Sequence, residues 1–112
     1  MSSFRAPQSL SQSLSQSLSL RLGAESADAA LRHEIMEEQA NSLGRAGKKV
    51  ETTLAALREH PGGDGRVEAL RAAADAVWAF LVQREAMGLR DRSYIVAHYR
   101  VPREVLNRLG GR

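Results

Sequence analysis

The chain has 112 residues, no cysteine and a net charge of +3, with 43% hydrophobic and 26% charged residues. This length allows one folded domain, and the absence of cysteine excludes disulfide bonds and cysteine-ligated zinc. No stretch has the roughly 18 consecutive apolar residues of a membrane-spanning helix, so we expect a soluble or peripheral protein.

The first 24 residues are rich in serine, leucine and glutamine. Within them the tetrad Gln-Ser-Leu-Ser occurs three times in succession and spaces Leu10, Leu14 and Leu18 four residues apart. A helix would place these leucines on one face, but the serines offer the backbone competing hydrogen bonds and the stripe is narrow. We therefore predict a disordered tail over residues 1–24 and a single helical domain over residues 25–112. The alternative is a tail that folds on a membrane or on a partner.

A long helix is predicted to begin near Ser26, with Ser26 or Asp28 as its N-terminal cap. Its apolar residues recur at alternating spacings of four and three, which is typical of a helix that packs along a second helix. These residues are Met36, Ala40, Leu43, Gly47, Val50, Leu54 and Leu57. Pro61 and the three glycines of the segment His60–Gly65 are predicted to end this helix.

A second helix is predicted to follow, capped by Asp64. Its inner face would consist of Val67, Leu70, Ala74, Val77 and Leu81. The short connection makes the two helices antiparallel neighbours, and folding back at the turn brings Trp78 close to Gly47. Glycine inside a helix costs about 1 kcal/mol relative to alanine, so Gly44 and Gly47 need a structural reason. We predict that they form a notch for Trp78; the alternative is that Gly44 kinks or ends the helix.

The C-terminal part is predicted to form two short helices. Gly88 ends the second long helix, and Asp91 or Ser93 begins the first short one. The last helix opens at Pro102, and its inner face would carry Val105, Leu106 and Leu109. The predicted fold class is therefore all-α: a long antiparallel helical hairpin with two short C-terminal helices, preceded by the Ser/Leu/Gln-rich tail.

Residues 91–109 resemble a helix-turn-helix, and residues 84–112 carry seven arginines against three acidic residues. In such a motif Arg103, Asn107 and Arg108 would face nucleic acid. The sequence departs from the motif because Arg100 occupies a position usually held by glycine. The last helix is also barely two turns long. Nucleic-acid binding is therefore the alternative function.

Three patterns that suggest chemistry are incomplete. The sequence His33-Glu34-Ile35-Met36-Glu37 lacks the second histidine of a helical zinc site, and Gly44-Arg45-Ala46-Gly47-Lys48-Lys49 lacks the first glycine and the hydroxyl residue of a phosphate-binding loop. The three histidines lie in separate segments without a nucleophile at motif spacing. We expect no enzymatic activity, no metal and no cofactor.

Four stretches of the sequence are distinctive. They are Glu34–Ala40, Leu43–Gly47, Ala76–Asp91 and Tyr99–Leu106. Together they resemble a group of small uncharacterised bacterial proteins classed as a domain of unknown function, over about residues 31–110. The resemblance implies a bacterial, cytoplasmic protein and brings no known activity.

The two long helices carry more apolar surface than they can bury against each other. Ile35 on the first helix and Trp78, Val82 and Leu89 on or after the second are the candidate interaction residues. A wide apolar surface needs another element or another subunit to cover it. The sequence therefore predicts a non-enzymatic interaction or structural module that associates with itself, as a homodimer, or with another protein.

Overall fold

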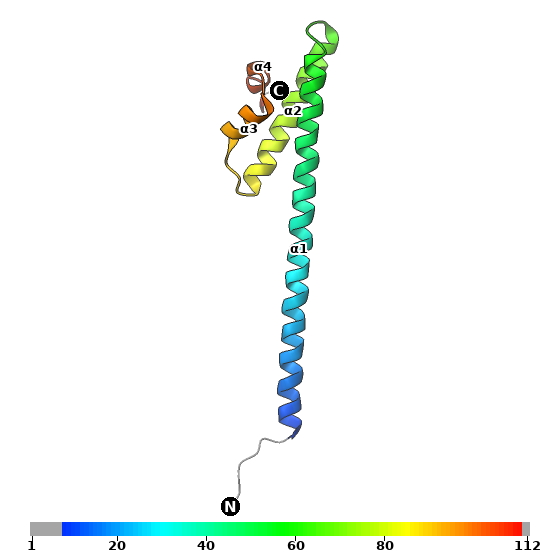
Figure 1. Cartoon of the computed structure of the whole chain (residues 1–112), viewed down its shortest axis with the longest axis vertical. Helices are drawn as coiled ribbons and strands as arrows, with labels where there is room; N and C mark the ends of the chain where they lie inside the picture. The colour runs from blue at the N-terminus through cyan, green and yellow to red at the C-terminus, as the bar shows by residue number, and fades with distance from the viewer. Residues whose placement is uncertain (1–7, 111–112) are drawn as a thin grey trace, which may run out of the picture. The chain divides into compact units, whose positions relative to one another are not determined.

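A computed structural model describes residues 8–110 of the chain, and these residues form four helices and no strand (Figure 1). The helices are α1 (Gln8–Arg58), α2 (Asp64–Ala86), α3 (Arg92–Tyr99) and α4 (Arg103–Leu106). The all-α prediction, with two long and two short helices, is confirmed. The chain divides within α1 into two compact units, Met1–Glu38 and Gln39–Arg112, called here the N-terminal and the C-terminal unit.

In the N-terminal unit, α1 begins at Gln8 and not near Ser26. Residues 8–24, which the sequence assigned to the tail, are helical in the structure, while residues 1–7 lie outside the described part. No proline interrupts this stretch, and pairs one turn apart support it, such as Arg32 with Asp28 at 2.9 Å. Asp28 consequently serves as an ion-pair partner inside the helix and not as its cap.

In the C-terminal unit, α2 turns back beside the end of α1, and α3 and α4 pack against this pair (Figure 1). The core consists of twelve buried apolar residues from all four helices and the α3–α4 turn. They are Val50, Leu54, Leu57, Ala73, Ala74, Ala76, Val77, Phe80, Leu81, Ile95, Val101 and Val105. The central residues of both predicted inner faces are thus buried together in one core.

The ends of the predicted stripes are more exposed than expected. Ala40 on α1 is exposed, and Val67 near the start of α2 is 53% exposed. Met36, at the start of the predicted stripe, is 67% exposed within the N-terminal unit. The inner face of the last helix is closer to the prediction, because Val105 is fully buried and Leu106 and Leu109 are half-buried.

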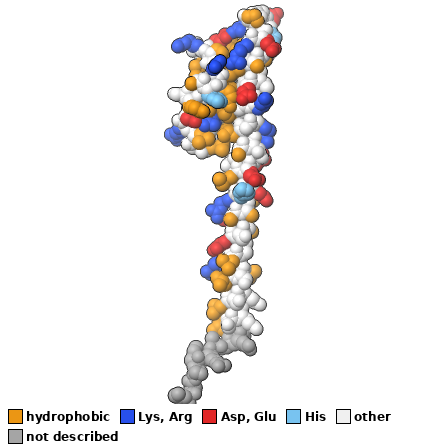
Figure 2. Space-filling model, viewed as in Figure 1, with side chains coloured by type: hydrophobic (Ala, Val, Ile, Leu, Met, Phe, Trp, Pro, Cys, Tyr) orange, Lys and Arg blue, Asp and Glu red, His pale blue; other side chains and the backbone are white. Residues whose placement is uncertain are grey.

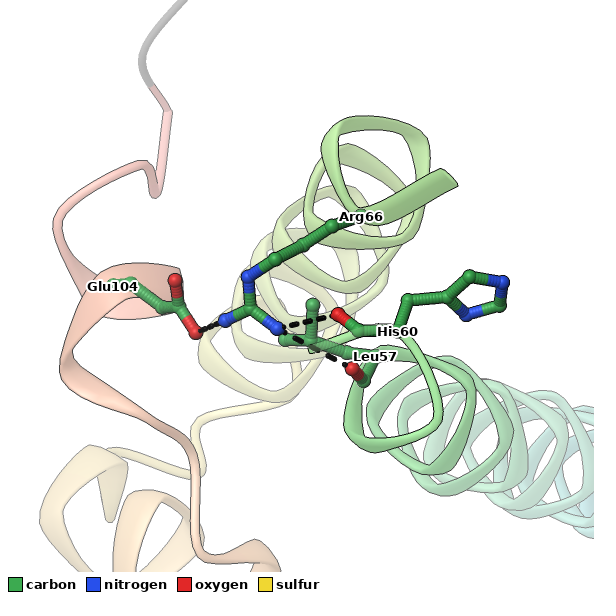
Figure 3. Close-up of polar contacts among 4 residues, drawn as sticks. All are labelled: Leu57, His60, Arg66 and Glu104. Carbon is green, nitrogen blue, oxygen red and sulfur yellow. Dashed lines mark hydrogen bonds and ion pairs between the residues drawn. The ribbon is translucent and has the colours of Figure 1, made fainter. Parts of the chain in front are cut away.

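Arg66 joins the turn between α1 and α2 to α4 (Figure 3). Its Nη1 donates to the carbonyl of His60 at 2.7 Å and lies 3.5 Å from the carbonyl of Leu57. Its Nη2 donates to Oε1 of Glu104 on α4. Carbonyls at the C-terminal end of a helix have no hydrogen-bond donors within the helix. Arg66 therefore supplies donors to backbone carbonyls at the end of α1.

Two helices end in the same hydrogen-bonded motif. After α2, the amides of Gly88 and Leu89 donate to the carbonyls of Glu85 and Arg84 at 3.0 and 2.9 Å, and Gly88 has φ +83°. This confirms Gly88 as the residue that ends the helix. After α3, Arg100 takes the equivalent left-handed position with φ 53° and ψ 51°, although it is not glycine.

Candidate ligand groove between α1 and α3

Two adjoining hollows lie between α1 and α3 in the C-terminal unit, with volumes of about 520 and 440 Å³. Both are lined by Glu51 and Tyr99, so together they form one groove. We call the first the cationic end; its other lining residues are Leu54, Arg58, His98 and Arg100. We call the second the apolar end; its other lining residues are Ala40, Leu43, Gly44, Gly47, Lys48, Phe80 and Arg84.

The close approach of α3 to α1 depends on Gly47. A Cβ atom at Gly47 would lie 2.8 Å from the hydroxyl of Tyr99 and 3.4 Å from the ring of Phe80. The two rings meet edge to face, with centroids 5.5 Å apart. At Gly44, by contrast, a Cβ atom would meet nothing within 4 Å. The notch therefore exists at Gly47 alone, and it receives Tyr99 and Phe80.

The prediction that Trp78 fills this notch is wrong. The Trp78 ring lies against Gly110, where a Cβ atom would be 3.4–3.6 Å from three ring carbons. Consecutive residues of a helix point about 100° apart, so when Val77 and Phe80 are buried, Trp78 faces another direction. The predicted rotation of α2 about its own axis is therefore corrected, because Phe80 and not Trp78 lies at Gly47.

At the cationic end, the guanidinium groups of Arg58 and Arg100 have no hydrogen bond or ion pair with any residue of the described range 8–110. His98 stacks on Tyr94 and meets Tyr99 edge to face. Figure 2 shows basic side chains around the apolar surface of the C-terminal unit. The groove thus combines unpaired positive charge with aromatic side chains.

The other charged residues of the groove are already paired. Arg84 donates two hydrogen bonds to Asp91, at 2.6 and 3.1 Å, and these bonds hold the pKa of that carboxyl below its usual range. Glu51 lies 3.6 Å from Lys48. The pKa of Tyr99 is raised, first by burial and then by the charge of Glu51, so its hydroxyl stays a neutral hydrogen-bond donor at physiological pH.

The sequence-predicted interaction residues all lie on the surface. Ile35 is 48% exposed in the N-terminal unit. Trp78, Val82 and Leu89 are 42%, 44% and 39% exposed in the C-terminal unit, and Trp78 and Val82 lie one turn apart on α2. The structure leaves all four side chains accessible to a partner.

The predicted nucleic-acid contacts Arg103, Asn107 and Arg108 are exposed as well. Arg100 does adopt the left-handed turn that a helix-turn-helix uses. However, α4 is one turn long, whereas a recognition helix presents several residues along a DNA groove. Nucleic-acid binding stays a prediction, and the short length of α4 does not favour it.

The groove itself was not anticipated from the sequence. Its residues come from three helices, so no local motif unites them. Two signals were present: Arg100 at a position that favours glycine, and the helical glycines Gly44 and Gly47. Neither signal indicates by itself which side chains meet.

The two glycines are expected to respond in opposite ways to alanine. Gly44→Ala should raise the free energy of unfolding by about 1 kcal/mol, because the site is open and alanine favours helix. Gly47→Ala should lower the free energy of unfolding by about 1 kcal/mol. Alanine again favours the helix, but the clash of its Cβ with Tyr99 costs more than this gain. Urea unfolding followed by circular dichroism measures both. In a Tyr99→Phe background the loss at Gly47 should become a gain; an unchanged loss would exclude the hydroxyl as its cause.

Arg100→Gly is expected to raise the free energy of unfolding by about 0.5–1 kcal/mol. The left-handed conformation costs a residue with a side chain roughly 1–2 kcal/mol, and the entropy of glycine in the unfolded chain offsets part of the gain. Arg103→Gly is the matched control. Arg103 lies in α4, so glycine there should be destabilising, and equal effects of the two changes in urea unfolding would contradict the assignment.

Within residues 8–110, no helix is both long and apolar enough to cross a membrane, and no three His, Asp or Glu side chains gather where they could hold a metal ion. In sequence, residues 8–112 match DUF6665, a family of unknown function. No curated protein and no solved structure matches the chain.

Proposed function

The chain belongs to DUF6665, a family of unknown function, and from its own residues we propose that it is a non-enzymatic helical interaction module that associates with a second copy of itself. The observation that carries this proposal is the exposed apolar surface of the N-terminal unit. Eight large apolar side chains in residues 8–38 are each 48–75% exposed: Leu10, Leu14, Leu18, Leu20, Leu22, Leu31, Ile35 and Met36. Figure 2 shows hydrophobic side chains recurring along this segment.

This part of α1 has no second element of its own unit to pack against among residues 8–38. An isolated helix in water is marginally stable, because most helical stability in proteins comes from packing an apolar face. Serine is also a weaker helix former than alanine, and serine makes up half of the tetrad repeat. A partner that covers the leucines would therefore stabilise the helix as well as bind it.

A second copy is the partner that fits the chemistry of this segment. The repeat over residues 8–19 has no charged residue, so it offers nothing that would select an oppositely charged protein. Further along, Arg32 pairs with Asp28, and His33 lies 3.1 Å from Glu37 on the same helix. Two copies would bring equivalent apolar rows together, and twofold pairing is the commonest symmetry of homo-oligomers.

The absence of enzymatic activity is part of the proposal and is supported by the surroundings of the histidines. His33 pairs with Glu37 on an exposed helix, and Nδ1 of His60 lies 2.8 Å from the carbonyl of Ala56. His98 contacts two tyrosine rings. None of these contacts combines a base with a nucleophile, which acid–base or covalent catalysis would need.

The test is the mass of the full chain in solution at micromolar concentration, measured by sedimentation or light scattering. We expect twice the 12.2 kDa of one chain, and helix content by circular dichroism that falls on dilution as the N-terminal unit loses its partner. The triple change Leu10→Gln, Leu14→Gln and Leu18→Gln should give a monomer at concentrations where the unchanged chain is dimeric.

The matched control is the double change Gln12→Ala and Gln16→Ala. These glutamines lie on the face of α1 opposite the leucines, so this variant should remain dimeric. A monomeric mass for the unchanged chain, or equal effects of the leucine and glutamine changes, would contradict the proposal.

A further inference from the structure

We propose that the groove between α1 and α3 binds an amphiphilic anion, a small molecule with a carboxylate or phosphate head and a short apolar body. The head would lie at the cationic end and the body at the apolar end. The groove belongs wholly to the C-terminal unit, so this proposal is independent of self-association through the N-terminal unit.

The head group is assigned from the unpaired cations. Arg58 and Arg100 line the same hollow, and neither guanidinium has a partner in the described residues. A guanidinium presents a planar fork of donors that matches the oxygens of a carboxylate or a phosphate. Tyr99 lines both hollows, and its neutral hydroxyl adds a donor beside Gly47, where the two hollows meet.

The backbone of Arg100 is a second indication of a ligand. Its left-handed conformation is one that glycine adopts without cost, and a strained backbone position often marks a functional site. The chain carries there a residue whose side chain lines the groove and finds no partner within it. A bound anion would provide the Arg100 guanidinium with the hydrogen-bonding partner that it lacks among the described residues.

The apolar body is assigned from the other hollow. Leu43, Gly47 and Phe80 provide its apolar lining, and the space beside Gly44 is open for at least 4 Å from a Cβ position. A volume of about 440 Å³ lies within the range of small-molecule pockets, whose walls are mostly apolar with a few polar groups that fix orientation.

The paired charges fix the orientation of the ligand. Arg84 at the apolar end is bonded to Asp91, so its charge is already offset. Glu51, at the junction of the two hollows, repels an anion in the middle of the groove and is itself only 3.6 Å from Lys48. The cationic end is therefore the place where an anionic head gains most.

The experiment is a titration of the isotope-labelled full chain followed by amide chemical shifts in nuclear magnetic resonance. The probes are sodium octanoate and octyl phosphate below their micelle-forming concentrations, acetate as the head alone, and octanamide as a neutral analogue. We expect saturable shifts at the amides of Gly47, Tyr99 and Arg100. Octanoate or octyl phosphate should bind at least tenfold more tightly than acetate or octanamide, and the tighter of the two identifies the head group.

Two variants separate binding from folding, because neither is expected to destabilise the protein. Arg100→Gly relieves the backbone and removes the charge, and it should weaken binding of the octyl probes at least tenfold. Gly44→Leu places a side chain in the open part of the apolar end and should weaken the same probes similarly. Arg103→Gln removes an exposed arginine that does not line the groove, and it should leave the affinity unchanged.

Three results would overturn the proposal. Equal affinity for octanoate and octanamide would show apolar binding without an anion site. If Arg100→Gly bound the octyl probes with unchanged affinity, Arg100 at the cationic end would not contribute to binding. Shifts at the groove amides with a single-stranded oligonucleotide but with neither octyl probe would assign the surface to nucleic acid.

Discussion

Replacing Leu54 with alanine is expected to lower the free energy of unfolding by about 3–4 kcal/mol. Leu54 is 2% exposed and belongs to the core that α1 forms with α2, α3 and α4. Truncating a buried leucine loses the transfer free energy of the removed carbons and leaves a cavity, which together cost about 2–5 kcal/mol. Urea unfolding followed by circular dichroism gives the difference.

The matched control for Leu54 is Val67→Ala on α2. Val67 is 53% exposed although the sequence placed it on the inner face, so its truncation should cost no more than about 0.5 kcal/mol. If Leu54→Ala fails to fold, the milder Leu54→Val should still cost about 1 kcal/mol. Comparable losses for Leu54→Ala and Val67→Ala would contradict the packing of the hairpin described above.

Replacing Arg66 with methionine is expected to lower the free energy of unfolding by about 2 kcal/mol, because hydrogen bonds to charged groups contribute about 1.5–3 kcal/mol. The side chain is 27% exposed, and methionine keeps most of its apolar contacts while removing every donor. This loss of stability has two sources. The carbonyl of His60 loses its hydrogen bond from Arg66, and the carboxylate of Glu104 loses its charged partner. Arg66→Lys should recover less than half of it, since an ammonium group cannot reach both partners in the same fork geometry.

Arg71→Met is the control for Arg66. Arg71 is exposed and only 4.0 Å from Glu68 on the same helix, so its loss should cost less than about 0.5 kcal/mol. A double change of Arg66→Met with Glu104→Gln should cost less than the sum of the two single changes. Strict additivity would mean that the two side chains do not interact in solution.

The elements that the sequence predicted well are those set by local chemistry. The stripe of Val50, Leu54 and Leu57 follows helical periodicity, and Gly88 ends α2 by a conformation that its own backbone favours. The turn from His60 to Gly65 is also local, because proline and glycine act through their own dihedral angles. Such features do not depend on the rest of the fold.

The elements that the sequence missed depend on rotation or on distant contacts. Serine-rich segments are close to the balance between helix and coil, so the start of α1 at Gln8 was not decided by propensity. The partner of Gly47 depends on how α2 is rotated about its axis, and the size of a side chain alone does not distinguish Trp78 from Phe80. The groove needs α3 to lie against α1, which no short-range pattern specifies.

Trp78 has a consequence for spectroscopy. It is the chain's one tryptophan, and its ring lies against Gly110 near the end of the described residues while 42% of it remains exposed. Its fluorescence emission therefore reports whether the last turn stays docked on α2. Because the ring does not line the groove or belong to the N-terminal unit, this signal can distinguish fraying of the C-terminal end from ligand binding and from association.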